Sequence, residues 1–418
     1  MINFKPFKST YLFLFLMLNF QLISCAQKPK AIVKKVTEKI PVLKIGAERT
    51  DLYLNLLKGK NVAVVANQTS VLSVLERAVV APNVMGSKNV THHLVDYLFS
   101  YNGINVKKVF APEHGFRGKA DAGEVVKDGF DTKTGLPIVS LYGKNKKPSA
   151  AQLAGIDVVV FDIQDVGARF YTYISSLHYV MEACAEAGIE VIVLDRPNPN
   201  GHYIDGPVLE LAHTSFVGMH KVPVVYGMTI GEYGQMINGE KWLKNGMQCN
   251  LKVIPLENYT HQTEYSLPIK PSPNLPNDKS INLYPSLCFF EGTNVSAGRG
   301  TEMQFQIYGS PFLTKSDFTF TPQANEGAKY PKFKNQLCYG KNLEEIGNLS
   351  KIDLSFLIKA YKQNTSKDFF NNFFTKLAGT KKLQEQIEKG ISEQEIRKTW
   401  QKDLNAFKLV RSKYLIYK

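Results

Sequence analysis

The sequence predicts an α/β protein, with a Rossmann-like open parallel sheet followed by a second, smaller α/β domain at the C-terminus. Three observations lead to this prediction. Short β-branched runs alternate with helical stretches between residues 59 and about 200, the runs are continuously apolar, and a proline-rich stretch then changes the composition. Continuous apolar runs are typical of strands that helices cover on both faces. With 418 residues, 44% of them hydrophobic, the chain can bury one or two cores, which excludes a disordered or disulfide-dense scaffold.

The first 41 residues have the pattern of an export signal followed by a tether. Lys5 and Lys8 precede an apolar run at residues 11–23, which is too short to span a membrane comfortably. The run ends in Leu-Ile-Ser-Cys, which resembles the lipobox of bacterial lipoproteins. We therefore expect a signal peptide at residues 1–24 and a lipidated Cys25 with a lysine-bearing tether at residues 25–41. The protein would then be anchored in a membrane, facing the periplasm; a plain signal peptide is the alternative.

The formal net charge is +14, and removal of the two signal-peptide lysines lowers it to +12. No basic nucleic-acid-binding motif accompanies this charge, so we expect no nucleic acid as a partner, and in an exported lipoprotein the charge suits an anionic membrane. None of the remaining cysteines has a Cys-x-x-Cys partner or a histidine at metal-ligand spacing, so no metal site is predicted. They leave three disulfide pairings open: Cys184, Cys249, Cys288 and Cys338.

The sheet is expected to occupy a first domain at residues 42–268. A helix is expected at Val90–Tyr101 and another at Tyr173–Ala187, where apolar residues share one face and Gly188 is placed to end the helix. Five strands are expected, in chain order Asn61–Ala66, Val106–Ala111, Leu136–Leu141, Asp157–Phe161 and Glu190–Leu194.

The second domain is expected at residues 269–418. Five prolines crowd residues 267–285, which predicts a segment without regular helix. Helices are predicted further on at Leu354–Tyr361 and Lys381–Glu388. Ser392 and Glu395 form a capping-box signature that opens a final helix, whose apolar face carries Ile396, Trp400 and Phe407.

Polar side chains follow four of the five predicted strands. Because parallel strands bring their carboxyl ends to one edge of a sheet, these side chains are expected to converge on one site. They are Asn67 after the first strand, Glu113, His114 and Arg117 after the second, Asp162, Gln164, Asp165 and Arg169 after the fourth, and Asp195 and Arg196 after the fifth.

The chain lacks the standard motifs of several enzyme classes. It has no phosphate-binding loop, no His-Glu-x-x-His zinc motif, no Gly-x-Ser-x-Gly nucleophile elbow and no Gly-x-Gly-x-x-Gly after a strand. A dinucleotide site therefore has little support. Carboxylates flanked by arginines, tyrosines and asparagines remain, and this set favours glycoside hydrolysis, which needs a carboxylic acid to protonate the leaving oxygen.

Five segments resemble the exo-β-N-acetylmuramidases of the NamZ type, and the resemblance extends from about residue 42 to 418. It implies a Rossmann-like domain and a smaller C-terminal domain with an active cleft between them. It also implies hydrolytic release of N-acetylmuramic acid from the non-reducing ends of peptidoglycan fragments in cell-wall turnover, without metal or cofactor. The segments are residues 111–118 (APEHGFRG), 162–173 (DIQDVGARFYTY), 195–201 (DRPNPNG), 271–276 (PSPNLP) and 284–301, from Tyr-Pro to Arg-Gly-Thr.

The resemblance implies that Glu113 is the catalytic acid/base. A general acid at neutral pH needs a raised pKa, from burial or a neighbouring carboxylate; the alternative is a turn glutamate paired with Arg117. His114 would orient Glu113 or contact the sugar, unless it is a structural histidine. The identity of the second catalytic group is left open between four carboxylates and the 2-acetamido group of the substrate. The carboxylates are Asp162, which we favour, Asp165, Glu124 and Glu291.

The lactyl carboxylate of the substrate distinguishes it from N-acetylglucosamine, and a bidentate arginine reads such a group efficiently. Arg117, Arg169 and Arg299 are the candidates, each with an internal salt bridge as the alternative. Gly298 and Gly300 around Arg299 would let the backbone approach a ligand. Further candidates for contacts with the sugar are Asn67, Gln164, Tyr171, Tyr173, Tyr226, Asn274 and Asn294.

Two other classes of function share features with this prediction. A non-catalytic sugar-binding lipoprotein would have the same anchor and cleft, and would bind muropeptides without cleaving them. An esterase or amidase acting on wall peptides is disfavoured by the missing nucleophile and zinc motifs.

Overall fold

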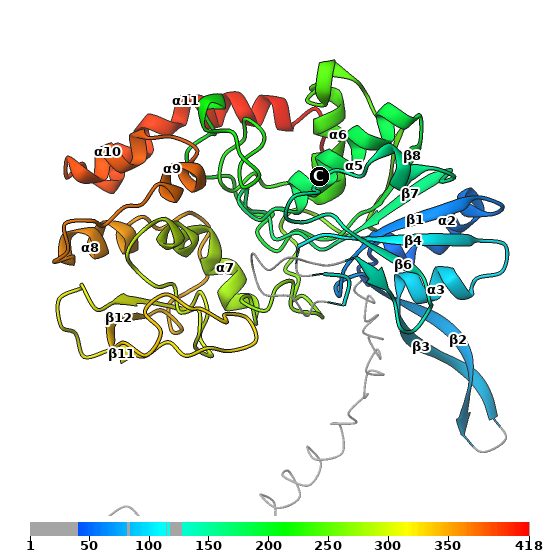
Figure 1. Cartoon of the computed structure of the whole chain (residues 1–418), viewed down its shortest axis with the longest axis horizontal. Coiled ribbons are helices and arrows are strands. Elements are labelled where there is room, and N and C mark those ends of the chain that lie inside the picture. Colours follow the sequence, from blue (N-terminus) through cyan, green and yellow to red (C-terminus); the bar gives the residue numbers. More distant parts are fainter. Residues whose placement is uncertain (1–40, 82–83, 114, 118–127, 418) are drawn as a thin grey trace, which may run out of the picture. The chain divides into compact units, whose positions relative to one another are not determined.

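The computed structural model describes residues 41–81, 84–113, 115–117 and 128–417, and Val42–Lys418 form one compact unit (Figure 1). The predicted signal peptide, Cys25 and nearly all of the tether lie outside the described residues. His114 and Glu124, two of the predicted site residues, lie outside them as well.

A seven-stranded sheet organises the N-terminal half, and its order is β5-β6-β4-β1-β7-β8-β9. All neighbours pair in parallel except β5, which is antiparallel to β6. After β1, the chain adds β4, β5 and β6 on one side of that strand. It then crosses over and adds β7, β8 and β9 on the other side, and this reversal is the topological switch point of a Rossmann-type sheet. The predicted sheet is confirmed. Its strands are β1 (Asn61–Ala66), β4 (Asn105–Ala111), β5 (Gly129–Phe130), β6 (Pro137–Ser140), β7 (Val158–Asp162), β8 (Glu190–Leu194) and β9 (Leu251–Ile254).

Helices cover both faces of this sheet, which explains the continuously apolar strands (Figure 1). Val62 and Val64 of β1 face a core formed with α2 (Thr50–Leu57) and α3 (Leu94–Ser100). Ala63 and Val65 face the opposite core, which includes residues of α5 (Tyr173–Ala187) and α6 (Ile230–Gly239). Helix α5 has the predicted bounds, and Gly188 ends it in a left-handed conformation with φ of 69°. Short helices are η1 (Gly46–Glu48), α4 (Ala150–Leu153), η2 (Leu211–His213) and η3 (Lys244–Gly246).

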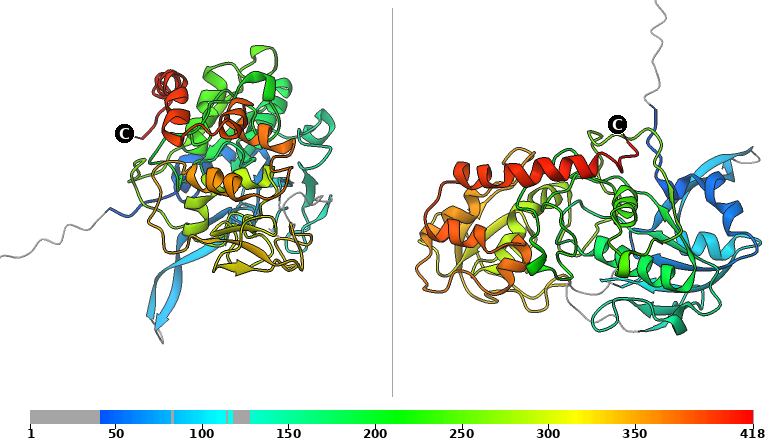
Figure 2. Two further views of the ribbon diagram at one scale, coloured as in Figure 1. Left: turned by 90° about the vertical axis from the view of Figure 1, so that its left-hand side faces the viewer. Right: turned by 90° about the horizontal axis from the view of Figure 1, so that it is seen from above.

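The helix predicted at Val90–Tyr101 is only half correct. Its first part belongs to β3 (Val84–His93), which pairs with β2 (Val71–Ala81) in a long antiparallel hairpin that projects from the sheet (Figure 2). The apolar spacing in this segment suits a helix, but residues there pair with β2 instead; Val90, for example, lies opposite Val74. Such cross-strand pairs stabilise the strand. Helix α3 begins only after His93, whose side chain accepts a hydrogen bond from the Val95 amide.

The C-terminal part combines helices with a small antiparallel sheet of order β10-β12-β11. The core that contains α5 continues into it, since that core also includes Phe289 and Phe374. None of the described helices is both long and apolar enough to cross a membrane. The strands are β10 (Ile307–Ser310), β11 (Thr319–Phe320) and β12 (Cys338–Asn342), and the helices are α7 (Asp278–Leu287), η4 (Cys288–Gly292), α8 (Ser355–Gln363), α9 (Phe373–Ala378), α10 (Lys382–Glu388) and α11 (Glu393–Arg411).

Helix α7 corrects the expectation that residues 267–285 exclude regular helix. Asn277 caps its start by accepting a hydrogen bond from the Ser280 amide, at 2.9 Å. Pro285 lies within the last turn, where it has no amide to donate to the carbonyl of Ile281. The Asn200 Nδ2 donates to that carbonyl instead, at 3.1 Å, so the helix can include the proline.

The helices predicted after residue 350 are confirmed as α8, α10 and α11, within one or two residues at each end. The side chain of Ser392 accepts from the Glu395 amide at the start of α11, as predicted, and Ile396, Trp400 and Phe407 are buried. Cys184, Cys249, Cys288 and Cys338 are also buried, and all four are free thiols, so none of the three disulfide pairings is formed.

Candidate active site

A cavity of about 300 Å³ lies at the carboxyl ends of β4, β6 and β7, where the switch-point rule places ligands. Its volume is at the lower end of the range for small-molecule sites. Residues of the sheet half form one side, and residues that follow Pro271 form the other. The lining residues are Glu113, Tyr142, Phe170, Tyr171, Thr172, Phe216, Val217, Ser272, Asn274, Leu275, Tyr284, Cys288, Glu291, Arg299, Phe305, Phe373 and Leu377.

Glu113 lies two residues beyond β4, and hydroxyl groups surround its carboxylate. The Thr172 hydroxyl donates to Oε2 at 2.8 Å, from the residue that precedes α5. The Tyr142 hydroxyl also hydrogen-bonds to Glu113; burial and the negative charge of Glu113 raise the pKa of Tyr142 well above its usual value. These two hydroxyls orient the carboxylate toward the cavity.

A buried tyrosine layer supports Glu113 from behind. Asn67 Nδ2 donates to the Tyr173 hydroxyl at 2.8 Å, and this hydroxyl lies 3.5 Å from the main-chain oxygen of Glu113. The Tyr171 ring packs edge-on against Tyr173, with ring centroids 5.0 Å apart, and its hydroxyl donates to the Pro271 carbonyl at 2.8 Å. Tyr171 lines the cavity, whereas Asn67 and Tyr173 lie one layer deeper.

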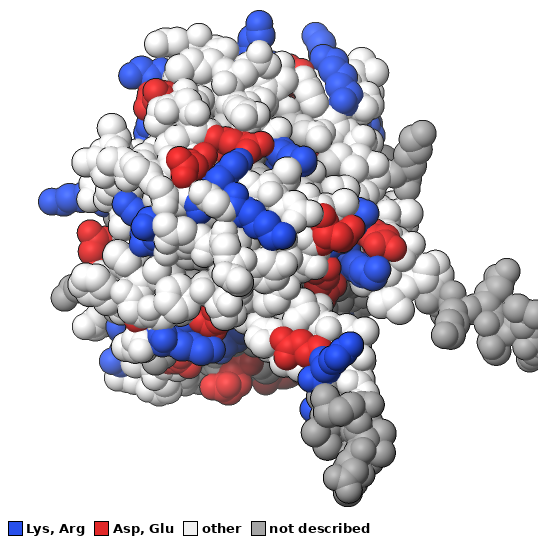
Figure 3. Space-filling view, turned by 90° about the vertical axis from the view of Figure 1, so that its right-hand side faces the viewer, with Lys and Arg blue, Asp and Glu red and all other residues white. Residues whose placement is uncertain are grey.

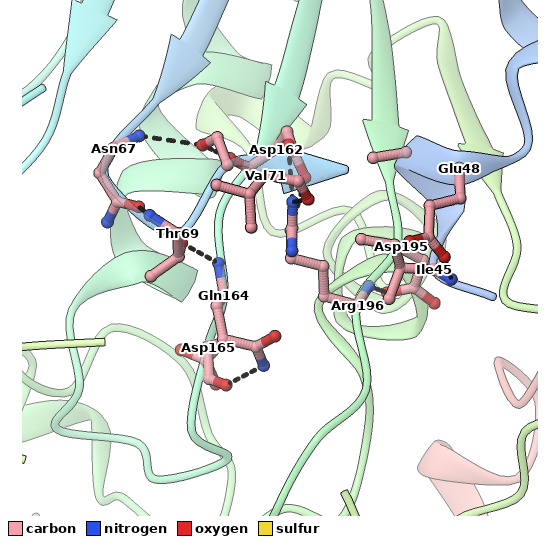
Figure 4. A network of polar contacts seen from close by, with 12 residues as sticks. Ile45, Glu48, Asn67, Thr69, Val71, Asp162, Gln164, Asp165, Asp195 and Arg196 are labelled. Atoms are coloured by element: carbon pink, nitrogen blue, oxygen red, sulfur yellow. Dashed lines mark hydrogen bonds and ion pairs between the residues drawn. The ribbon is translucent and has the colours of Figure 1, made fainter. Parts of the chain in front are cut away.

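Asp162, the favoured second carboxylate, lies away from the cavity lining. It is fully buried, and Arg196 binds both of its oxygens, through Nε at 2.6 Å and Nη2 at 2.9 Å (Figure 4). Arg196 Nη2 also donates to the carbonyl of Val71 at 3.0 Å. This bidentate pair joins the ends of β7 and β8, so the observed contacts of Asp162 position Arg196.

Asp165 and Gln164 are also buried behind the cavity rather than lining it. Asp165 accepts hydrogen bonds from the Tyr226 hydroxyl and from the Gly167 amide, the latter at 2.7 Å. Burial raises the pKa of Asp165 to about 7. Gln164 Nε2 donates to the carbonyls of Asp165 and Pro197, at 2.8 and 2.6 Å (Figure 4). The hydrogen bonds of Asp165 and Gln164 hold the loop after β7 in place, and Tyr226 belongs to the same hydrogen-bond network.

Glu291 is the second carboxylate among the described lining residues. It comes from η4, and Arg299 Nη1 lies 3.7 Å from its Oε2. Arg299 Nη2 and Asn274 Nδ2 both donate to the carbonyl of Gly327, at 3.4 and 2.6 Å. The C-terminal half therefore contributes a cluster of one carboxylate, one guanidinium and one amide to the cavity.

The two glycines around Arg299 are required by the packing of the protein itself. Both have φ of +81°, which favours glycine. A Cβ atom at Gly298 would lie 2.7 Å from the Met303 carbonyl, and one at Gly300 would lie 2.6 Å from the Gln323 carbonyl. Close packing within the protein thus requires these glycines.

The other two candidate arginines have internal partners. Arg169 is fully buried, and its guanidinium donates to four carbonyls, those of Pro207, Val222, Leu377 and Ala378, at 2.7–2.9 Å. Burial lowers its pKa to about 9. Arg117 lies between Asp96 and Asp131, with nearest contacts of 3.2 and 2.9 Å. Neither arginine lines the cavity, and Asn294 lies outside it too, donating to Asn364 and to the Asp368 carbonyl.

Several lining residues were not singled out from the sequence. Thr172 and Tyr284 lie inside the motifs that carry the family resemblance, and Tyr142 lies at the end of a predicted strand, so a signal for these three was present. Phe216 and Phe373 come from segments without any recognised pattern. Among the described residues, no cluster of three His, Cys, Asp or Glu side chains could hold a metal ion.

Comparison with known proteins places the chain in a family. The family model described as exo-β-N-acetylmuramidase NamZ, N-terminal, matches residues 62–279, and its C-terminal counterpart matches residues 282–417. The peptidoglycan β-N-acetylmuramidase NamZ of Bacillus subtilis is 36% identical over 408 residues, covering 92% of this chain and 94% of that protein.

Two crystal structures of DUF1343 family proteins from Bacteroides fragilis have the same fold. One is 45% identical with a TM-score of 0.80, and the other is 28% identical with a TM-score of 0.73. Each comparison covers 90% of this chain and 99% of the other. By sequence over nearly its whole described length, the chain belongs to the exo-β-N-acetylmuramidase NamZ family.

Proposed function

We propose that this protein is a glycoside hydrolase, an exo-β-N-acetylmuramidase that releases N-acetylmuramic acid from peptidoglycan fragments. The single observation that carries the proposal is Glu113, which faces a sugar-sized cavity and is oriented by the hydroxyls of Thr172 and Tyr142. Membership of the NamZ family supports the same activity. Purified protein should release N-acetylmuramic acid from a disaccharide that carries this sugar at its non-reducing end.

Glu113 is proposed to act first as an acid. Its carboxylic acid gives a proton to the glycosidic oxygen as the bond from that oxygen to C1 of the muramic acid breaks. As that bond breaks, C1 bonds to the second catalytic group, and the Glu113 carboxylate then takes a proton from the water whose oxygen displaces this group from C1. The products are N-acetylmuramic acid and a glycan shortened by one sugar, and Glu113 returns to its protonated form.

The second catalytic group is proposed to be Glu291, since it lines the cavity while Asp162 is engaged by Arg196. The 2-acetamido group of the substrate is the competing nucleophile. The replacement Glu291→Gln distinguishes these two possibilities. If Glu291 assists attack at C1, kcat falls by about 100-fold or more; if the acetamido group alone does so, kcat changes by less than about tenfold.

Arg299 is proposed to recognise the lactyl carboxylate of the muramic acid, because it is the one candidate arginine that lines the cavity among the described residues. Asn274 lies beside it, sharing the Gly327 carbonyl as hydrogen-bond acceptor, and is 3% exposed. Its amide is placed to bind a hydroxyl or acetamido group of the same sugar.

Two alternative activities give distinct products. A sugar-binding protein would retain the disaccharide intact, and an esterase or amidase would leave the glycosidic bond uncut. Mass spectrometry of the reaction mixture identifies which bond is broken.

Export with a lipid anchor is a separate proposal, supported by the apolar run at residues 11–23 and by the Leu-Ile-Ser-Cys sequence that ends at Cys25. Mass spectrometry of the N-terminal peptide tests it. A diacylglyceryl modification on Cys25 is the expected result, and an unmodified cysteine, or cleavage elsewhere, contradicts it.

A further inference from the structure

A second cavity, of about 640 Å³, adjoins the active-site cavity. Phe216 lines both cavities and so forms a wall between them. The second cavity is built from residues 211–221, from the middle of α5 and from Trp242, which follows α6. None of its other lining residues belongs to the active-site cavity.

Aromatic rings dominate the walls of this second cavity. The rings of Tyr179 and Phe216 are stacked, with centroids 6.2 Å apart and an angle of 14° between their planes. Trp242 stacks on His220 at 4.6 Å and 15°. Tyr179, Phe216 and Trp242 are all partly exposed, and Lys146 Nζ lies 4.9 Å from the centroid of the Phe216 ring. Aromatic rings in a cavity wall are the groups that pack against the apolar face of a pyranose.

A buried polar network forms the floor. His220 contacts the Tyr233 hydroxyl at 3.0 Å and His178 at 2.9 Å, and His178 lies 3.5 Å from Glu182. Burial lowers the pKa of both histidines, which keeps their rings neutral. The network holds the floor rigid, because both ring nitrogens of each histidine have a polar partner.

We propose that the second cavity binds the sugars on the reducing side of the cleaved bond. The inference rests on the proposed function, since it places the terminal muramic acid beside Glu113. The rest of the glycan must then continue out of the active-site cavity, and the aromatic cavity begins at its wall, Phe216. It is also about twice as large as the first cavity.

A competing path leads through a third cavity, of about 340 Å³, which shares Glu291 and Arg299 with the active-site cavity. Its aromatic residue is Tyr330, 92% exposed, and Lys332 lies partly buried in its wall, donating to three carbonyls. This charged and smaller cavity fits a pyranose chain less well than the aromatic one.

The experiment compares two substrates of the full-length protein. The first is 4-nitrophenyl β-N-acetylmuramide, which has no sugar beyond the cleaved bond; the second is the tetrasaccharide MurNAc-GlcNAc-MurNAc-GlcNAc. We expect Tyr179→Ala to lower the ratio of kcat/KM for the tetrasaccharide to kcat/KM for the aryl muramide about three- to tenfold, mainly through KM. Tyr179→Phe, which keeps the ring, should retain the wild-type ratio.

Tyr330→Ala is the matched control, and its ratio should equal that of the wild type. An unchanged ratio in Tyr179→Ala, or a fall in Tyr330→Ala instead, overturns the assignment of the glycan path. If Tyr179→Ala does not fold, Tyr179→Leu keeps much of the packing on α5 and removes the ring. Failure of the proposed function is distinguishable, because the wild-type protein would then release no muramic acid from either substrate.

Discussion

Glu113 lies two residues beyond β4 and Asp162 is the last residue of β7, and their surroundings give them different roles. Glu113 borders a cavity and accepts hydrogen bonds from the hydroxyls of Thr172 and Tyr142. Asp162 is fully buried and bound by Arg196 through both oxygens. Glu113 is therefore the carboxyl group that can meet a substrate, and the ion pair of Asp162 serves the structure.

Asp162→Asn should therefore destabilise the protein. It leaves the guanidinium of Arg196 buried without a charged partner, and loss of one partner of a buried pair costs about 3–5 kcal/mol. Urea denaturation measures this as a lower unfolding midpoint. An unchanged midpoint combined with loss of kcat would instead assign Asp162 to catalysis.

Arg299→Gln should weaken recognition of the muramic acid. Removal of a charge-assisted contact to the lactyl carboxylate raises KM for an aryl N-acetylmuramide about tenfold or more. The corresponding N-acetylglucosaminide has no lactyl group, so any residual activity on it should be unaffected. Arg117→Gln is the control, since Arg117 lies between Asp96 and Asp131, and equal effects of both changes would contradict the role of Arg299.

The sequence could place candidates at the site but could not rank them. Asp162 and Glu113 both come within two residues of the end of a predicted strand, and Arg169 and Arg299 both lie in the motifs. Only the fold decides that Arg169 is enclosed by four carbonyls while Arg299 reaches the cavity. Phe216 could not be predicted, because it comes from a loop that the chain topology brings to the cavity.

At the scale of elements, Arg169 joins the two halves of the protein. Its four acceptors belong to the loops around Pro207 and Val222 in the N-terminal half and to the end of α9 in the C-terminal half. These loops carry Phe216, and α9 carries Phe373 and Leu377, all of which line the cavity. The buried guanidinium therefore fixes two walls of the active site relative to each other.

Arg169→Lys should lower the thermal unfolding midpoint by several degrees. An ammonium group cannot reach four carbonyls in the planar arrangement of a guanidinium, and each buried carbonyl left without a donor costs about 1–3 kcal/mol. Scanning calorimetry measures the midpoint, and Lys398→Arg, an exchange on an exposed side chain, provides the control. A midpoint equal to that of the wild type would contradict a clamping role.

The elements that the sequence predicts best are those with a single dominant signal. Strands β1 and β8 and helix α5 have the predicted bounds, because continuous apolar runs and an amphipathic face with a terminal glycine leave no competing interpretation. The β2–β3 hairpin was missed because its stability depends on cross-strand pairs. Helix α7 was missed because Asn200, distant in sequence, accommodates Pro285.

At the scale of the whole molecule, the positive charge does not gather into one patch on the face shown in Figure 3. Lysine and arginine side chains lie among acidic ones there. The electrostatic features that affect stability are instead buried. Burial raises the pKa of both Asp165 and Asp195 to about 7.

The raised pKa values of Asp165 and Asp195 predict that the free energy of unfolding falls as pH rises from about 4 to 7. Over that range the folded protein keeps protons that the unfolded chain, with a pKa of about 3.9, releases. Their contribution is therefore complete below about pH 4 and is lost as pH rises through 7. Asp165→Asn keeps the acceptor for Tyr226 and should reduce the slope of unfolding free energy against pH by about 1 kcal/mol per unit. An identical slope in denaturation series at several pH values would contradict this assignment.

The central claim is that Glu113 performs acid/base catalysis on a muramic acid glycoside. The most direct measurement is the rate at which wild-type protein and Glu113→Gln release N-acetylmuramic acid from MurNAc-GlcNAc, with circular dichroism to show that both are folded. We predict release by the wild type and a kcat at least about 100-fold lower for Glu113→Gln. No release by the wild type, or release at the full rate by Glu113→Gln, would contradict the claim.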